Sequence, residues 1–314
     1  MTRPLLAIQL DPPATLKPTT DTSLMLMAEA ARRGYEVAYY LPQELSWRAG
    51  ELLAPLTPIT LDFSVAQFFQ SGEPTLTPLA EASVVLMRQD PPFDMGYITA
   101  THLLEQLPAT TPVWNRPAGV RNAPEKLSAL GFRQYLPPTL ISRDLEVIHA
   151  FAEEHAAIVA KPLYGFGGHS VFKFARGDRN LETLLEQWCQ TSREPLMWQA
   201  FLPEVKDADR RVIFIGGEVA ATFRRVPEEG SIRANMRAGG KAVADAELSS
   251  QQQEVCAALG PFLRREGLLL AGIDFIGDYL TEINVTCPTG LRAAERLYGI
   301  NLATRFWDAV ESAK

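Results

Sequence analysis

Uninterrupted runs of apolar residues, rather than alternating ones, mark the first 120 or so residues of the chain. They occur at 5–10, 35–41, 84–88 and, more briefly, 112–115. Such runs are typical of strands that are buried on both faces of a parallel sheet. Residues 23–33 have helical composition, and Gly34 follows them as a stop signal. The order strand, helix, strand predicts a right-handed βαβ unit within an open parallel α/β domain.

Ligands of such sheets lie beyond the carboxyl ends of the strands. Residues 11–22 and 88–94 follow two of the predicted strands, and each includes an Asp-Pro-Pro segment, at Asp11 and at Asp90. Both segments therefore occupy positions where ligands of such a sheet are expected.

Shorter strands with hairpin signals follow from residue 156 onward. The expected strands lie at 156–161, 170–174, 196–201, 211–215 and 218–224, and the expected helices lie near 179–190 and 249–266. The pair Gly216–Gly217 favours an antiparallel hairpin between two of these strands. Residues 272–285 have the pattern strand, turn, strand around Gly277–Asp278. This half of the chain is therefore predicted to be α+β.

Composition and charge narrow the function classes. The chain has 314 residues, of which 46% are hydrophobic, and this length suggests about two domains. A net charge of −7 repels nucleic acid and anionic membranes, so we expect neither as a partner. Three scattered cysteines favour a reducing compartment, and no run of about 20 apolar residues occurs. A cytoplasmic protein is predicted.

A glycine-rich segment follows the apolar strand that ends at Lys161. It contains Gly165, Gly167 and Gly168. Backbone N–H groups of such a loop can turn inward and bind phosphate oxygens, and the lysine adds a positive charge. The segment matches neither the Walker pattern nor the dinucleotide fingerprint. By itself it fits a hairpin turn with a surface lysine equally well.

Two carboxylates and a carboxamide occur in the last predicted hairpin. Glu282 and Asn284 are two residues apart and share one face of their strand. If the preceding strand pairs with it across the turn, Asp274 lies opposite them. Such hard oxygen ligands suit Mg²⁺ that bridges nucleotide phosphates. A solvated strand face is the alternative from the residues alone.

Positive charge is concentrated between Arg210 and Lys241. Seven basic residues face three acidic ones in this window, a balance of +4. Its later part has little apolar content and ends in Gly239–Gly240, as expected of a loop that closes over an anion. A basic solvated face is the alternative. The sequence contains no Gly-x-Ser-x-Gly elbow, and its four histidines have no metal-binding spacing.

These segments occur together in the order that is found in ATP-grasp ligases: Asn122-x-x-Glu125-Lys126, then Lys161 with the glycine loop, Arg210-Arg211, Asp274 and Glu282-Ile283-Asn284. More closely, the chain resembles the bacterial glutathione synthetase family. The segments that carry this resemblance lie at 32–36, 87–94, 235–240 and, most specifically, 280–290. The resemblance implies an N-terminal α/β substrate domain, 1–121, and an ATP-grasp module whose subdomains, 122–202 and 203–314, clasp ATP.

The resemblance also implies roles for individual residues. Lys126 and Lys161 match lysines that contact the ATP phosphates, and Gly165, Gly167 and Gly168 belong to the loop that covers them. Gln199, Phe201 and Leu202 match the strand that lies beside adenine. Asp209 matches the residue that contacts the ribose. Arg211 and Arg225 match residues that stabilise the transferred phosphate or the acyl phosphate. Arg233 and Asn235 match residues of the lid loop. The residues that match ligands of Mg²⁺ or Mn²⁺ are Asp274, Glu282 and Asn284. The resemblance also implies that the Asp-Pro-Pro segments at Asp11 and Asp90, with Arg88, line the peptide-substrate side.

The implied reaction joins γ-glutamylcysteine to glycine through an acyl phosphate and yields glutathione, ADP and phosphate. The implied partners are these small molecules and further copies of the chain. Tyr164, Ala200 and Cys287 depart from the family pattern, which commonly has an acidic, a polar and a serine residue there. Two alternatives remain: an ATP-grasp ligase with a different peptide or amino-acid acceptor, and a nucleotide-binding regulator without catalysis.

Overall fold

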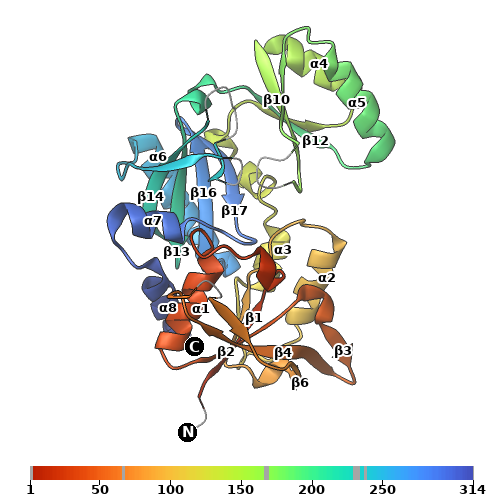
Figure 1. Ribbon diagram of the computed structural model, residues 1–314. Coiled ribbons are helices and arrows are strands. Elements are labelled where there is room, and N and C mark those ends of the chain that lie inside the picture. The colour runs from red at the N-terminus through yellow and green to blue at the C-terminus, as the bar shows by residue number, and fades with distance from the viewer. Residues whose placement is uncertain (1–2, 66–67, 166–169, 229–233, 237–238, 314) are drawn as a thin grey trace.

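Three β-sheets organise the described part of the chain. A computed structural model describes residues 3–65, 68–165, 170–228, 234–236 and 239–313 (Figure 1). The first sheet has the strand order β3-β4-β2-β1-β7-β8, and β5 and β6 also pair with β4. Its strands are β1 (Leu5–Gln9), β2 (Glu36–Tyr40), β3 (Ser46–Arg48), β4 (Glu51–Leu61), β5 (Phe69–Ser71), β6 (Thr75–Pro78), β7 (Val84–Met87) and β8 (Val113–Trp114).

The parallel part of this sheet confirms the sequence prediction. Strands β2, β1, β7 and β8 are neighbours, and each pair is parallel. The structure adds an antiparallel extension, β3 to β6, that the sequence did not predict. Its long strand β4 includes Pro55 and Pro58, and prolines within a run count against a strand because they cannot donate to the ladder.

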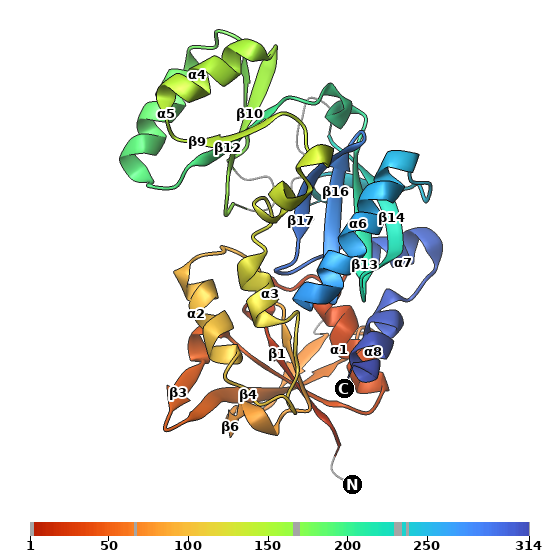
Figure 2. The ribbon, with the colours of Figure 1, turned by 180° about the vertical axis from the view of Figure 1, so that it is seen from behind.

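Helices cover both faces of the first sheet. Helix α1 (Thr22–Arg32) lies on one face, and α2 (Met95–Leu104) and α3 (Pro117–Asn122) lie on the other (Figure 2). Because side chains alternate along a strand, Leu6 and Ile8 of β1 join the core of α1, whereas Ala7 joins the core of α2. Asp21 begins α1, since its carboxylate accepts the N–H groups of Ser23 and Leu24.

The second sheet has a core of its own. Its antiparallel strands follow the order β11-β10-β12-β9. The elements of this central unit are β9 (Thr139–Ser142), α4 (Leu145–Glu154), β10 (Ala157–Pro162), β11 (Phe172–Ala175), α5 (Asn180–Thr191) and β12 (Leu196–Ala200). Its hydrophobic cluster includes Ile148, Ile158, Phe174 and Trp198. Among the described residues, no residue of the other two sheets belongs to this cluster. The central unit accordingly stands apart from the rest of the molecule (Figure 1).

The third sheet is antiparallel, in the order β15-β14-β13-β16-β17. Its elements are β13 (Asp209–Ile215), β14 (Glu218–Val226), β15 (Lys241–Ala244), α6 (Ser250–Glu266), β16 (Leu270–Ile276), β17 (Tyr279–Asn284), α7 (Leu291–Tyr298) and α8 (Leu302–Ser312). The turn between β13 and β14 confirms the predicted hairpin. Gly216 and Gly217 both have positive φ, 63° and 76°, which side chains other than glycine rarely tolerate.

The first and third sheets are joined through common cores. One cluster contains residues of α2 and α6, and the other contains residues of α1, α7 and α8. At the junction, the guanidinium of Arg33, just after α1, donates to Asp308 and Glu311 of α8, both at 2.6 Å. The 3₁₀ turns are η1 (Pro13–Thr15), η2 (Pro42–Glu44), η3 (Leu79–Glu81), η4 (Ser128–Tyr135) and η5 (Pro203–Lys206).

No helix in the described part of the chain is both long and apolar enough to cross a membrane. The domain bounds 1–121, 122–202 and 203–314 stay predictions, although the three sheets fall within them.

Candidate active site

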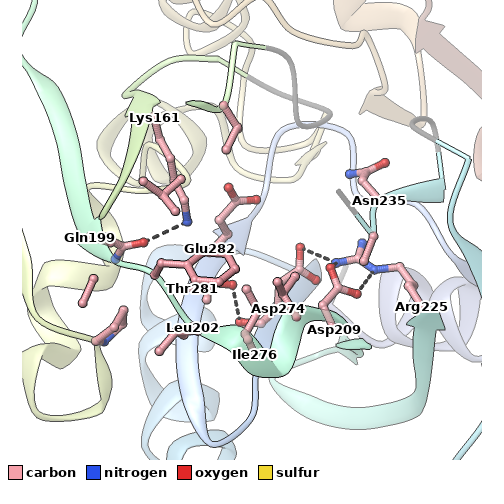
Figure 3. A pocket seen from close by; sticks show the side chains of 17 residues that line it. Lys161, Gln199, Leu202, Asp209, Arg225, Asn235, Asp274, Ile276, Thr281 and Glu282 are labelled. Carbon is pink, nitrogen blue, oxygen red and sulfur yellow. Dashed lines mark hydrogen bonds and ion pairs between the residues drawn. The ribbon is translucent and has the colours of Figure 1, made fainter. Parts of the chain in front are cut away.

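The main pocket lies between the central sheet and the third sheet (Figure 3). Its space of about 810 Å³ includes open solvent at its mouth, and we call it the first pocket. Its lining comprises Pro137, Val159, Lys161, Val171, Gln199, Ala200, Phe201, Leu202, Val205, Asp209, Arg225, Ala234, Asn235, Asp274, Ile276, Thr281 and Glu282. Apolar side chains supply one part of this lining and charged side chains another. Such a division suits a ligand with a flat apolar ring and an anionic tail.

The terminal hairpin places its polar side chains on one face, as the sequence predicted. Asp274 of β16 lies directly opposite Glu282 of β17, and Gly272 lies opposite Asn284. The Asn284 side-chain amide donates to the Gly272 carbonyl and to Asp274 Oδ2, both at 3.1 Å. Two carboxylates and a carboxamide therefore converge at the inner side of the pocket.

Two arginines hold Asp274 in place. Arg211 donates Nε to Oδ1 at 2.5 Å and Nη2 to Oδ2 at 2.8 Å, and Arg225 Nη2 lies 3.0 Å from Oδ2. Arg225 also binds both oxygens of Asp209, at 2.6 and 2.7 Å. Burial alone would raise the pKa of Asp274, but the two guanidiniums more than offset it and keep that pKa below its usual range. Asp274 is thus ionised and oriented.

Two lysines approach the same region from different elements. Lys161, near the end of β10, donates to Gln199 Oε1 of β12 at 2.8 Å, and burial lowers its pKa. Lys126 is almost fully buried; it donates to the Gly165 carbonyl at 2.6 Å and lies 3.7 Å from Glu282 Oε1. Both ammonium groups therefore lie close to the terminal hairpin, where an anionic ligand would need them.

A second pocket adjoins the first, and Asn284 of the same hairpin face lines it. It encloses about 430 Å³, and its lining comprises Asp90, Pro91, Glu125, Arg211, Asn235, Asn284, Thr286, Cys287, Pro288 and Thr289. Asn235 lines both pockets. Glu125 accepts the Thr286 hydroxyl at 2.8 Å, and burial together with the neighbouring Glu282 raises its pKa to about 7. The second pocket is therefore small, polar and contiguous with the charged part of the first.

Arg88 lies behind the second pocket rather than in its lining. Its side chain is buried, with Nη2 donating to the Pro288 carbonyl at 2.9 Å and Nε to Ser23 Oγ at 3.1 Å. Asp11 reaches the pocket indirectly, because its carboxylate accepts the N–H of Asp90 at 2.7 Å. Burial raises the pKa of the Cys287 thiol well above its usual range, which makes it a poor nucleophile.

The structure brings most of the predicted site residues together. The first pocket holds Lys161, Gln199, Phe201, Leu202, Asp209, Arg225, Asn235, Asp274 and Glu282. Lys126, Gly165, Arg211 and Asn284 lie beside it through the contacts above. Gly167, Gly168 and Arg233 lie outside the described residues. Glu125 and Thr281 were not predicted as site residues; the Glu125-Lys126 pair in the motif was the available signal for the first.

The polar side chains around Asp274 include oxygen ligands of the kind that a divalent cation requires. Within the described ranges, no group of three or more His, Cys, Asp or Glu side chains is placed to hold a metal ion. Asp274, Glu282 and the carboxamide of Asn284 nevertheless share one strand face, and such oxygen ligands suit Mg²⁺. A cation at Asp274 would share that carboxylate with Arg211 and Arg225. The residue chemistry therefore fits a divalent metal.

Comparisons with known proteins cover nearly the whole chain. The family model "Prokaryotic glutathione synthetase, N-terminal domain" matches residues 5–121, and "Prokaryotic glutathione synthetase, ATP-grasp domain" matches 125–299. Glutathione synthetase of Rhodopseudomonas palustris is 47% identical over 98% of both chains. That of Pseudomonas aeruginosa is 40% identical over 97% of this chain and 96% of its own.

Solved structures share the fold at low sequence identity. D-cycloserine synthetase DcsG matches with a TM-score of 0.68 at 16% identity, covering 98% of this chain and 99% of its own. The ATP-grasp ligase PsnB, complexed with a minimal precursor, matches with a TM-score of 0.65 at 18% identity, covering 99% of each chain. The predicted ATP-grasp fold is confirmed. The chain belongs to the prokaryotic glutathione synthetase family.

Proposed function

We propose that this chain is a glutathione synthetase, which joins γ-glutamylcysteine to glycine at the cost of ATP. One observation carries the proposal: two pockets meet at a single hairpin face that bears Asp274, Glu282 and Asn284. The first pocket has an apolar part for adenine and a charged part for phosphates. The second, smaller pocket suits the peptide and glycine, and Asn235 lies between the two.

The charged residues suit phosphoryl transfer, which requires positioning and neutralisation of charge rather than a covalent nucleophile. We propose that Lys126 and Lys161 bind the ATP phosphates, and that Arg211 and Arg225 stabilise the transferred group. Gln199, Phe201 and Leu202 lie beside the adenine in this proposal, and Asp209 near the ribose. The glycine loop, with Gly165, Gly167 and Gly168, and the lid residue Arg233 would cover the phosphates.

We propose that Asp274, Glu282 and Asn284 hold Mg²⁺, with Mn²⁺ as the alternative. When bound, such an ion neutralises the β- and γ-phosphate oxygens. The chain itself keeps Asp274 ionised through Arg211 and Arg225.

The reaction proceeds in two steps. An oxygen of the peptide carboxylate attacks the γ-phosphorus and ADP departs, which leaves an acyl phosphate. The glycine amine then attacks the acyl carbon, phosphate departs, and the amine loses a proton. Because water would hydrolyse the acyl phosphate, closure of the site is required between the steps. A cytoplasmic location and a homo-oligomeric state also belong to this proposal.

Phosphate release from ATP and Mg²⁺ tests the proposal, with γ-glutamylcysteine and glycine supplied separately and together. We expect fast release only with both, and glutathione as the product. Release with another amine in place of glycine would instead support a ligase with a different acceptor. Tight ATP binding without turnover for any acceptor would overturn the proposal in favour of a nucleotide-binding regulator.

A further inference from the structure

A stacked aromatic pair joins the first sheet's loops to the central unit. Phe93 follows β7, and Tyr164 follows β10; their ring centroids lie 6.0 Å apart with planes inclined by 22°. Phe93 is buried and also packs against Tyr97 of α2, with centroids 5.2 Å apart. Tyr164 of the central unit therefore packs against a hydrophobic core that the first and third sheets share.

One side of this pair faces the second pocket. A small cleft adjoins the two rings, and it is lined by Pro91, Phe93, Pro124, Glu125, Leu163, Tyr164 and Gly165. Pro91 and Glu125 line the second pocket as well. A ligand that presses on Pro91 or Glu125 therefore acts on residues that adjoin the aromatic pair.

The other side of the Phe93–Tyr164 pair is connected to the first pocket through Gly165 and Lys126. Gly165, next to Tyr164, accepts a hydrogen bond from Lys126 at 2.6 Å, and Lys126 lies 3.7 Å from Glu282 of the first pocket. The central unit has a separate hydrophobic core, whereas the first and third sheets share theirs. Its placement over the third sheet therefore depends on junction contacts such as the Phe93–Tyr164 pair.

We infer that Tyr164 is a positioning residue that couples the second pocket to ATP binding. Its ring rests on Phe93 and thereby fixes the end of β10, and with it Gly165 and Lys126. A peptide in the second pocket packs against the residues that adjoin Phe93. This inference rests on the proposed function. It adds that the peptide strengthens ATP binding through these two rings.

Steady-state kinetics at saturating glycine and Mg²⁺ tests the inference. In the unmodified enzyme, we expect the KM for ATP to fall as γ-glutamylcysteine is raised. Tyr164→Leu, which keeps an apolar side chain without a ring, should raise the KM for ATP about threefold to tenfold. It should also abolish the dependence on peptide, with kcat changed less than about twofold. Tyr164→Phe should behave as the unmodified enzyme.

Matched variants distinguish this coupling from a general loss of stability. Phe93→Leu should reproduce Tyr164→Leu, and the double variant should be no worse than either single one. Phe262→Leu removes a different aromatic pair, with Phe132 at 5.5 Å, and neither ring lines either pocket. It should lower the melting temperature without changing the KM for ATP. Additive effects of the two leucine variants, or a KM that still falls with peptide in Tyr164→Leu, would overturn the inference.

Calorimetric titration separates this inference from the proposed function. Binding of ATP and Mg²⁺, measured with and without γ-glutamylcysteine, needs no turnover. If the enzyme makes no glutathione but the peptide still tightens ATP binding in a Tyr164-dependent way, the proposed function fails and the coupling holds. If glutathione forms but Tyr164→Leu leaves ATP affinity and its peptide dependence unchanged, the coupling fails alone.

Discussion

The Asn115 side chain links the first sheet to the third by hydrogen bonds. Its removal should be among the single substitutions that lower the stability of the chain most. Asn115 follows β8 and is 6% exposed. Its side-chain amide donates to the carbonyls of Leu270, at 2.7 Å, and Val285, at 2.8 Å, and its Oδ1 accepts the Leu270 N–H at 2.9 Å. One side chain thus satisfies three backbone groups of β16 and of the residue after β17.

The magnitude follows from these three hydrogen bonds. Asn115→Ala leaves three buried backbone groups without their partner, at roughly 1 kcal/mol or more each. We therefore expect the free energy of unfolding to fall by about 3 kcal/mol. Because the first and third sheets share their cores, they should unfold together. For a unit of that size, the melting temperature should fall by roughly 6 to 12 °C.

Denaturant unfolding, followed by circular dichroism, measures this loss. Asn180→Ala serves as the control, because Asn180 is exposed and its amide bonds only Asp178 nearby; it should lower the free energy of unfolding by less than about 0.5 kcal/mol. Asn115→Asp keeps the volume but replaces the group that donates to both carbonyls, so it should not restore stability.

Hydrogen exchange locates the effect. Amides of β1, β16 and α8 should exchange faster in Asn115→Ala, whereas those of β12 and α5 should keep their protection, since they belong to the separate core of the central unit. A loss below 1 kcal/mol, full rescue by Asn115→Asp, or equal loss of protection in the central unit would refute the reasoning.

Three further changes test the site and its surroundings. Asp274→Asn should lower kcat at least about 100-fold and change peptide affinity less than about twofold; unchanged kcat would mean that the metal assignment is wrong. The pKa of Glu125 is raised from 4.5 to about 7, so the folded protein loses stability as the pH rises through this window, by about 3 kcal/mol in total. In Glu125→Gln, the free energy of unfolding measured by denaturant titration should no longer fall between pH 5 and 8. Glu81 is exposed, and Glu81→Gln should leave that fall in place. Gly119→Ala places a Cβ 2.1 Å from the Glu266 carbonyl oxygen, so we expect a clear drop in melting temperature, whereas Gly131→Ala, whose Cβ meets nothing within 4 Å, should be neutral.

Local sequence patterns were sufficient where neighbouring residues decide the structure. The apolar runs predicted β1, β2, β7 and β8 because the residues of these strands pack into the cores on both faces of the sheet. Gly216–Gly217 gave the hairpin of β13 and β14, since only that turn geometry requires two positive φ angles. The strand period of two, together with the Gly277–Asp278 turn, gave the placement of Asp274 opposite Glu282.

Long-range contacts were beyond the reach of the same patterns. Asn115 bonds residues 155 and 170 positions away, and nothing in its neighbourhood distinguishes it from an ordinary strand end. The pKa of Glu125 is raised by burial and by Glu282, which lies more than 150 residues later in the chain. Arg88, expected to line the substrate site, instead supports Pro288 from behind. In each case the outcome depends on which elements pack together, and a single sequence pattern does not contain that information.

The basic window from Arg210 to Lys241 shows why a charge balance needs a structure. Its balance is +4, yet three aspartates outside the window bind four of its arginines. Asp245 lies 2.9 Å from both Arg210 and Arg224, Asp209 binds Arg225, and Asp274 binds Arg211 and Arg225. With these three aspartates included, the balance falls to +1. Attraction of an anionic nucleotide therefore rests less on the window's net charge than on Lys126 and Lys161, whose ammonium groups lie beside the first pocket. Arg211 and Arg225 are already bound to Asp274, so besides the role proposed for them at the transferred group they hold Asp274 in one position before any ligand arrives.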